Sequence, residues 1–375
     1  MIYLDSAATT LQKPPQVARA CAWAASHLAS PGRGGHRPAM AAGETAFACR
    51  QAAAELFHVP QPEQVVFTSS ATHGLNIAIK SLVPPGGRVV ISGYEHNAVT
   101  RPLHAIPGVT VAVAGGPLFA PQDTLAAFDR LITPDTSAVI CTHVSNVFGF
   151  ILPIADIARL CRTRGVPFIV DASQSAGCLS VDFQALGAEF IAMPGHKGLY
   201  GPQGTGLLLC AQKGVPILQG GTGSASAVQE MPDFLPDRLE AGTHNMVGIA
   251  GLLEGLRFVQ REGVERIGRR ERQLIARAGE KLSRLPWVEP FWDPSGKSQA
   301  GVLSFRVRGR DCEWVGEMLG ERDAALRAGL HCAPLAHQSA GTLETGTVRL
   351  SVSAFNTPWE IDRLVQLLHA MGPGA

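Results

Sequence analysis

The sequence has no excess of charge of either sign and no long apolar run. Its 375 residues carry 32 Lys and Arg against 31 Asp and Glu, a formal net charge of +1. This balance gives no electrostatic reason to expect a nucleic acid or a membrane surface as partner. No segment approaches the roughly 18 apolar residues of a spanning helix. The first residues lack the basic and apolar regions of a secretory signal, so we expect a cytoplasmic protein.

The eight cysteines form no C-x-x-C pair. Several of them, such as Cys141 and Cys210, lie inside apolar runs, where a thiol behaves as a small buried hydrophobe. Scattered cysteines of this kind indicate a reduced, cytosolic protein. The sequence also has no internal repeat, no low-complexity segment and no convincing Walker or dinucleotide-binding glycine pattern. Its glycines cluster instead around Lys197 and at 220–221.

Strand-like and helix-like segments alternate over the first two thirds of the chain, which is typical of a mostly parallel sheet. The segments that predict strands are 65–68, 89–92, 109–113, 137–142, 168–171, 190–193 and 206–210. Those that predict helices are 72–81, a segment from residue 97, 121–131 and 154–164. With 46% hydrophobic residues, a chain of this length can bury a large core.

The pattern changes after residue 248. A charged helical stretch runs to about residue 285, short strands are expected at 301–307 and 347–352, and a helix at 358–371 closes the chain. We therefore expect an α/β protein with two domains. The large domain covers residues 16–250, a smaller α+β domain covers 251–375, and the N-terminal segment 1–15 packs on the small domain or lines the cleft.

An acid and a lysine follow two predicted strands. Asp171 ends an apolar run, and Lys197 follows the next predicted strand 26 residues later, in a glycine-rich loop. Ligands of open α/β sheets bind at the carboxyl ends of strands, and a lysine out of bulk water becomes nucleophilic. With Gln174 and His196 beside them, the two suit pyridoxal phosphate (PLP), which a lysine holds through a Schiff base while an acid keeps its pyridine nitrogen protonated. A structural Asp–Lys ion pair is the alternative.

Three polar loops follow other predicted strands. Residues 69–73 precede a helix, where backbone N–H groups can bind the cofactor phosphate or the hydroxyls can cap the helix. His96 could stack on a cofactor ring or carry protons, although a histidine in a loop can also be merely solvated. The third loop, residues 144–149, contains Asn146.

Two late segments bear on the reaction type. Cys332 lies beside His331 in a segment bounded by glycine and proline, which suits an exposed, activated thiol. The alternatives are a buried cysteine, or a metal site made of His331, Cys332 and His337, for which no second ligand cluster is evident. Arg349 lies in a strand-like run and needs an anionic partner, which a substrate carboxylate bound bidentately would supply.

Nine segments occur in the order of one known family: Tyr3–Thr9, Val66–Thr72, Glu95–His96, His143–Asn146, Val170–Gln174, Gly195–Lys197, Leu239–Thr243, His331–Cys332 and Val348–Ser351. In this set the chain resembles the class V, fold-type I PLP enzymes. Within them it resembles the group II cysteine desulfurases and selenocysteine lyases of Suf and Csd type. The resemblance covers nearly the whole chain. The Asp-x-x-Gln and His-Lys pairs are typical of the superfamily, and the His-Cys segment is typical of desulfurases.

The resemblance implies how the cofactor is held. Lys197 would bind PLP covalently and move the α-proton of the substrate, and Asp171 would pair with the pyridinium nitrogen. His96 would stack on the ring and assist proton transfer. The other implied cofactor contacts are Gln174 at the phenolic oxygen, Ala71, Thr72 and His196 at the phosphate, Asn146 beside the ring, and Thr243 from a neighbouring subunit.

The resemblance also implies the substrate contacts. Asn146 and Arg349 would fix the substrate, His36 would line its pocket, and Cys332 would accept the sulfur. Three features depart from the family pattern. Pro194 stands where the family usually has a serine that contacts the phosphate, Gly198 is inserted after the lysine, and the N-terminal extension of group II is absent.

The implied activity is that of a cysteine desulfurase, which converts L-cysteine to L-alanine and leaves a persulfide on Cys332. The implied assembly is a homodimer that passes sulfur to an acceptor protein, as in iron–sulfur cluster assembly, without a metal in the site. The alternatives are a selenocysteine lyase acting on L-selenocysteine, or a class V aminotransferase or epimerase in which Cys332 is not catalytic.

Overall fold

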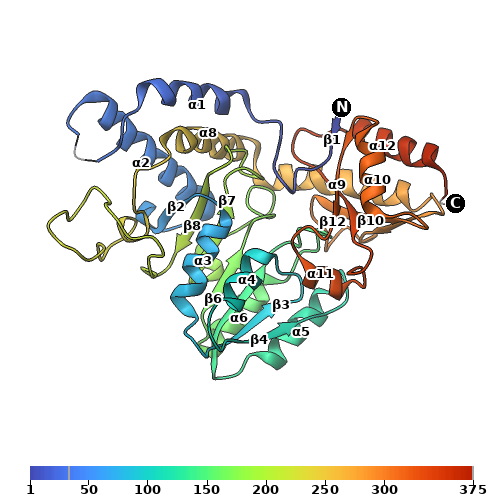
Figure 1. The fold of residues 1–375 in the computed structure, drawn as a ribbon, viewed down its shortest axis with the longest axis horizontal. Helices are drawn as coiled ribbons and strands as arrows, with labels where there is room; N and C mark the ends of the chain where they lie inside the picture. The colour runs from blue at the N-terminus through green and yellow to red at the C-terminus, as the bar shows by residue number, and fades with distance from the viewer. Residues whose placement is uncertain (33, 374–375) are drawn as a thin grey trace.

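A computed structural model describes residues 1–32 and 34–373. Its large sheet has seven strands in the order β2-β8-β7-β6-β5-β3-β4 (Figure 1). Only β8 runs antiparallel to its neighbours, so the predicted mostly parallel sheet is confirmed. The strands are β2 (Val65–Thr68), β3 (Arg88–Ser92), β4 (Thr110–Ala114), β5 (Thr136–Thr142), β6 (Phe168–Asp171), β7 (Phe190–Pro194) and β8 (Gly206–Cys210).

Helices cover both faces of this sheet, so its central strands are buried on both sides. Successive residues point to opposite faces: Val65 packs with one hydrophobic core and Val66 with the other. This explains the continuous apolar runs that predicted the strands. One face carries α3 (Ala71–Leu82) and α4 (Asn97–His104). The other carries α2 (Arg37–Phe57), α5 (Pro121–Leu131), α6 (Ile154–Arg164), the short α7 (Phe183–Leu186) and α8 (Met246–Glu262).

The C-terminal part forms a second sheet of four antiparallel strands, in the order β12-β13-β10-β9. Its elements are α9 (Val264–Leu282), β9 (Val288–Phe291), β10 (Val302–Val307), α10 (Cys312–Gly320), β11 (Ala324–Ala325), β12 (Arg327–Gly329), α11 (Pro334–Ser339), β13 (Thr347–Ser351) and α12 (Pro358–Met371). The N-terminal strand β1 (Ile2–Tyr3) pairs with β11, and Ile2 and Leu4 are buried in this core. From there the chain crosses to α1 (Pro15–His27), which packs on α8 (Figure 1).

The single charged helix expected from residue 248 to about 285 is two helices, because Gly263 adopts a positive φ of 82° between α8 and α9. Apolar side chains of α8, such as Leu252, pack with the large sheet, whereas those of α9, such as Leu274, pack with the small one. The chain therefore passes from the core of the large sheet to the core of the small sheet near Gly263, and not at residue 250. The division of the chain into domains stays a prediction. In the described ranges, no helix is long and apolar enough to cross a membrane.

A buried ion pair fixes one edge of the large sheet. The guanidinium of Arg50, on α2, donates to both carboxylate oxygens of Glu240, at 2.7 and 2.5 Å, and lies 4.1 Å from the ring centroid of Phe67. Glu240 also accepts from the Phe67 backbone at 2.6 Å and contacts His244 Nε2 at 2.5 Å. The pair thus connects helix α2, strand β2 and the segment that leads into α8.

We expect Glu240→Gln to lower the free energy of unfolding by about 3 kcal/mol, because it leaves the buried Arg50 without a counter-charge. Urea unfolding followed by circular dichroism measures the change. The matched control is Asp156→Asn, which breaks the exposed pair of Asp156 with Arg159 and should cost less than about 1 kcal/mol. Equal losses in the two variants would contradict a special contribution of the buried pair.

Candidate functional site

The loops that follow β2, β3, β5, β6 and β7 meet around a small cavity of about 100 Å³. It lies at the carboxyl ends of the parallel strands, where open α/β sheets bind their ligands. Eight of the residues expected in the site line this cavity: Ala71, Thr72, His96, Asn146, Asp171, Gln174, His196 and Lys197. These residues are up to 126 positions apart in the sequence. They come together, as expected, because each lies at or after the carboxyl end of a strand in the same, mostly parallel sheet.

Lys197 and Asp171 form the centre of the cavity. Asp171 ends β6 with its side chain buried, and its Oδ1 accepts a hydrogen bond from Ser173 N at 2.9 Å. Burial lowers the pKa of Lys197 to about 8, even though the negative charge of Asp171 acts in the opposite direction. Near neutral pH a minority of Lys197 is therefore a neutral amine, but a far larger fraction than for a solvated lysine. Among the described residues the two form no ion pair within 4.0 Å, so the structural alternative is absent.

His96 is fixed by its place at the start of α4. Its Nδ1 accepts a hydrogen bond from Ala98 N at 2.9 Å as the cap of the helix, so the ring proton lies on Nε2. Burial lowers the pKa of His96, with the charge of Asp171 opposing and that of Lys197 adding to the effect. The site therefore holds a neutral imidazole with a fixed orientation, which suits a ring that stacks on a planar ligand.

The first turn of α3 offers a place for an anion. The side chain of Ser70 accepts from His73 N at 3.2 Å, whereas the preceding N–H groups of Ala71 and Thr72 have no partner within the helix. These groups carry the positive end of the helix dipole. Opposite them, burial lowers the pKa of His196 to about 4, and the nearby charges of Lys197 and Lys13 lower it further. The neutral His196 can donate or accept at the rim.

These side chains fit PLP. The start of α3 suits its phosphate, Asp171 its pyridinium nitrogen, Lys197 its aldehyde carbon and His96 the face of its ring. Two buried polar atoms beside them lack hydrogen-bond partners, Oδ1 of Asn146 and Nε of Arg349. Because buried polar atoms are normally satisfied, these two indicate a bound polar ligand next to the cofactor.

Arg349 lies behind the cavity rather than on its wall. It projects from β13 with 3% of its surface exposed. Its Nη1 donates to the backbone oxygen of Asn146 at 3.0 Å and its Nη2 to Asp5 Oδ1 at 3.0 Å. Burial lowers the pKa of Arg349, and Asp5 opposes this shift. The anionic partner that the sequence required is therefore Asp5 in this structure, and Arg349 is one hydrogen bond away from the cavity wall formed by Asn146.

Cys332 is the cysteine that the structure exposes, whereas Cys21 is half-buried and the other six are buried. Its backbone oxygen accepts from Asn97 N at 2.8 Å, and the oxygen of His331 accepts from Asn146 Nδ2 at 2.7 Å. The loop is therefore attached on one side next to His96 and on the other to the cavity wall. His331 and Cys332 both adopt positive φ angles, 50° and 57°, which is uncommon outside glycine and clusters at functional sites.

The metal alternative at this loop is not supported. Burial lowers the pKa of His331 to about 2, and its Nε2 lies 3.1 Å from the carbonyl oxygen of Thr347. A carbonyl only accepts, so Nε2 carries the proton and is not free to bind a metal. Within the residues that the structure describes, no three His, Cys, Asp or Glu side chains gather into a possible metal site.

Two residues expected in the site lie elsewhere in this single chain. Thr243 is exposed and lines a different pocket, of about 440 Å³, beside β2 and the loop before α8. His36 is exposed and caps α2 by accepting from Ala39 N at 3.4 Å. Neither reaches the Lys197 cavity of its own chain. Their placement in the site of a neighbouring subunit stays a prediction.

The first residues of the chain form part of the site that spacing did not reveal. We call residues Asp5–Lys13 the N-terminal strap. Hydroxyls of Thr9 and Thr10 and the Lys13 ammonium all donate to the carbonyl oxygen of His196, at 3.3, 3.0 and 2.8 Å. The backbone oxygen of Ala7 accepts from Gln174 Nε2 at 3.0 Å. The Tyr3–Thr9 segment matched the family, but nothing in its composition indicated these contacts.

Two of the three departures from the family pattern, Pro194 and Gly198, have clear places in the structure. Pro194 ends β7 and lines the cavity, so it adds an apolar surface where a hydroxyl would donate to the phosphate. Gly198 packs against the loop after β6: a Cβ there would lie 2.3 Å from the backbone oxygen of Ala176. The inserted residue is therefore tolerated as glycine only, because any side chain would clash with the backbone after β6.

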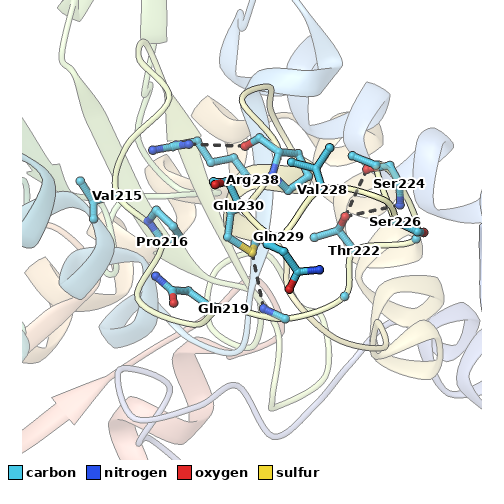
Figure 2. A pocket seen from close by; sticks show the side chains of 16 residues that line it. Val215, Pro216, Gln219, Thr222, Ser224, Ser226, Val228, Gln229, Glu230 and Arg238 are labelled. Carbon is cyan, nitrogen blue, oxygen red and sulfur yellow. Dashed lines mark hydrogen bonds between the residues drawn. The ribbon is translucent and has the colours of Figure 1, made fainter.

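A pocket of about 710 Å³ lies in the long loop between β8 and α8 (Figure 2). Its wall is mostly backbone and small polar side chains, including Thr222 and Ser224, whose hydroxyls lie 3.1 Å apart. Arg238 donates to the carbonyl oxygen of Gly214 and closes one side. None of the residues expected to bind the cofactor or the substrate belongs to its wall.

Comparisons with known proteins agree with this geometry. A probable cysteine desulfurase of Xylella fastidiosa is 34% identical over 384 residues, which cover 98% of this chain and 90% of the relative. The structure of the apo cysteine desulfurase from Thermococcus onnurineus NA1 superposes with a TM-score of 0.92 at 30% identity, covering 99% and 94% of the two chains. The cysteine desulfurase CsdA from Escherichia coli, in an S-sulfonic acid form, gives 0.86 at 28% identity, covering 98% and 94%. The model of the aminotransferase class-V family matches residues 2–364, and the chain therefore belongs to this family.

Proposed function

We propose that this chain is a PLP-dependent cysteine desulfurase, which removes the sulfur of L-cysteine and leaves L-alanine. One observation carries the proposal: the loop with the exposed Cys332 is attached beside the Lys197 cavity, because Asn97 N donates to the backbone oxygen of Cys332 and Asn146 Nδ2 donates to that of His331. Relatives named cysteine desulfurase cover almost the whole chain. A thiol in this position is what distinguishes sulfur transfer from other reactions of the family.

When bound, PLP withdraws electrons from the substrate carbon next to the amine, so that the α-proton can leave and the C–S bond can break. The chain's residues support this chemistry in three ways. Asp171 keeps the ring nitrogen protonated, and the start of α3 binds the phosphate. Lys197, with its lowered pKa, can take up and return a proton at the substrate carbon.

The substrate needs a fixed carboxylate. Arg349 is placed for this, since its unpaired Nε is a charged donor behind the cavity, and the unpaired Oδ1 of Asn146 is an acceptor that suits the amine of the same substrate. A charge-assisted hydrogen bond to a carboxylate is stronger and more directional than a neutral one. The amino acid would then present its sulfur toward the side where the Cys332 loop closes the cavity.

The sulfur transfer balances without an external oxidant. The C–S bond of cysteine breaks, an S–S bond forms to the sulfur of Cys332, and the thiol proton ends on the product, so that L-cysteine and the enzyme thiol become L-alanine and the enzyme persulfide. A thiolate is the natural nucleophile for sulfur. Release of the persulfide sulfur as sulfide then needs two electrons from a thiol reductant or an acceptor.

A homodimer and an acceptor protein are part of this proposal. Exposed apolar side chains lie on α1, α2 and α8, namely Trp23, Met40, Phe47 and Val247, which supports a subunit interface on this side of the molecule. Thr243 lies in the same region, shortly before α8. The loop of Cys332 is short and attached at both ends, so the thiol cannot swing far, which favours an acceptor protein that comes to it. Use in iron–sulfur cluster assembly and a cytoplasmic location stay predictions.

The alternatives find less support. Aminotransferase or epimerase chemistry needs no thiol at the cavity, and it leaves the attachment of the Cys332 loop unexplained. A selenocysteine lyase would use the same cavity, but the relatives compared here are named for cysteine. Both remain outcomes that the following experiments can distinguish.

Lys197→Ala should lose the covalent attachment of PLP. Borohydride reduction followed by peptide mass spectrometry should find the adduct on Lys197 in the wild type and none in the variant. Lys13→Ala is the matched control, because Lys13 contacts His196 and burial lowers its pKa to about 8 as well. This control should keep the adduct on Lys197. An adduct on Lys13 in the wild type would show that the wrong lysine is assigned.

Arg349→Ala should raise the KM for L-cysteine by about one to two decades, because a hydrogen bond to a charged group contributes roughly 1.5–3 kcal/mol. The absorbance of bound PLP should be largely unchanged. Arg306→Ala is the control, since Arg306 lies on neighbouring β10 and pairs with Glu289 at 2.8 Å, away from the cavity. If both variants keep the wild-type KM, the carboxylate binds elsewhere.

Cys332→Ala should bind PLP and change its spectrum with L-cysteine, yet produce almost no sulfide or alanine. Wild type and variant are incubated with L-cysteine and dithiothreitol, and both products are measured. Cys21→Ala, which removes the half-buried thiol, should keep full activity. Equal output from Cys332→Ala and wild type would argue against the persulfide mechanism, and L-selenocysteine would then be the substrate to test.

A further inference from the structure

Two arginines face each other in the small sheet. Arg327 on β12 is the direct partner of Arg349 in the antiparallel pairing of β12 with β13. Like charges directly opposite each other in a sheet are destabilising, and Arg349 is almost completely buried. The arrangement therefore needs an anion between the two side chains.

Asp5 of the N-terminal strap is this anion, and each of its two oxygens binds a different arginine. Oδ1 accepts from Nη2 of Arg349 at 3.0 Å, and Oδ2 accepts from Nε and Nη2 of Arg327 at 3.1 and 3.0 Å. Because Arg327 occupies Oδ2, Asp5 cannot bind Arg349 through both oxygens. Asp5 uses one N–H of Arg349 and the Asn146 carbonyl uses another, so three of the five guanidinium N–H groups stay free, including the unpaired Nε.

The backbone of the strap holds Asp5 in this place. Asp5 forms a parallel bridge with Ser351, the last residue of β13. Ser351 N donates to Leu4 O at 2.8 Å, and Ala7 N donates to the Ser351 hydroxyl at 2.8 Å. Two residues after Arg349, the strap is therefore fastened to the same strand. The position of the Asp5 carboxylate is therefore set by the backbone contacts of the strap with β13.

We propose that Asp5 is a positioning residue for the substrate carboxylate. Asp5 binds the Arg349 guanidinium on the side away from the ligand and leaves the free N–H groups of Arg349 for the ligand. Arg327 acts through Asp5, because it keeps that carboxylate attached to Arg349 through one oxygen only. This inference rests on the proposed function, in which Arg349 binds the carboxylate of L-cysteine. Asp5 does not contact the substrate itself, so its effect is on affinity and not on the chemical step.

The first test compares Asp5→Asn with the wild type. We expect the KM for L-cysteine to rise about tenfold. Without the negative charge of Asp5, the Arg349 side chain is no longer fixed in advance, so the substrate must fix it on binding and binds more weakly. The kcat and the absorbance of bound PLP should change less than twofold. Glu289→Gln is the matched control: it removes the carboxylate that pairs with Arg306 on β10 of the same sheet, and should leave KM and kcat unchanged.

A binding measurement separates this inference from the proposed function. Calorimetry with 3-mercaptopropionate, which has the carboxylate and thiol of cysteine but no amine, should show about tenfold weaker binding to Asp5→Asn. It should be weaker still for Arg349→Ala. If only Arg349→Ala weakens it, the role of Asp5 is refuted and that of Arg349 stands. If neither variant weakens it, the carboxylate site is wrong, and both proposals about it fail.

A double-mutant cycle tests whether Arg327 acts through Asp5. Arg327→Ala alone should raise the KM for L-cysteine several-fold, because the freed Asp5 oxygen can turn to Arg349 and occupy its free N–H groups. In the Asp5→Asn background the same change should have little further effect, since the residue through which it acts is gone. Two effects that simply multiply would indicate general destabilisation and would overturn the assignment.

Discussion

The removal of Lys197 from bulk water is the constraint on which the site depends. A charged ammonium loses hydration free energy when it is buried, so burial lowers the pKa of Lys197 to about 8. Strands β6 and β7 are neighbours in the sheet, buried on both faces, and they end with Asp171 and Pro194 at the same edge. The reactive amine is therefore positioned by backbone pairing, and its neighbours by the loops that follow the other strands.

Burial also explains why the first residues of the chain belong to the site. The loop that carries Lys197 has backbone carbonyls that need donors, and the strap supplies them, since three donors converge on the oxygen of His196. Further along, the same strap places Asp5 against Arg349 on the small sheet. A segment of nine residues thus connects the lysine end of the site, built on the large sheet, with the arginine end, built on the small one. The relative position of the two sheets therefore determines how Lys197 and Arg349 lie relative to each other.

Much of this could be predicted from the sequence. Apolar runs that end in Asp171 and precede Lys197 predicted the strands and the sheet edge, because strand ends of one parallel sheet meet at one side. The family and fold, predicted from motifs in a fixed order, are confirmed. Helices α1 and α2 were not predicted, since their alanine-rich sequence gives a weak apolar period. The break at Gly263 was missed because charged residues continue on both sides of it.

Contacts between residues far apart in the sequence could not be predicted. Asp5 and Arg349 are separated by 344 positions, and no local pattern shows that they meet. The same holds for the backbone hydrogen bonds of the Cys332 loop to Asn97 and Asn146. The glycine, proline and histidine neighbours of Cys332 predicted an exposed thiol in a loop. They did not predict where in the fold this loop lies.

The placement of the thiol and of the lysine on different parts of the fold has a physical consequence. Lys197 lies in the loop directly after β7 of the large sheet, whereas Cys332 lies in the short loop between β12 and α11, in which His331 and Cys332 both adopt a positive φ. Such a conformation persists only where the surroundings fix it, and here two hydrogen bonds do so, from Asn97 N to Cys332 O and from Asn146 Nδ2 to His331 O. The Cys332 loop is thus attached to the loops that follow β3 and β5 of the large sheet. Asn146 connects this loop with Arg349, because its side chain donates to the oxygen of His331 and its backbone oxygen accepts from Nη1 of Arg349. With the roles that we propose for Arg349 and Cys332, substrate binding and presentation of the sulfur acceptor are coupled through Asn146.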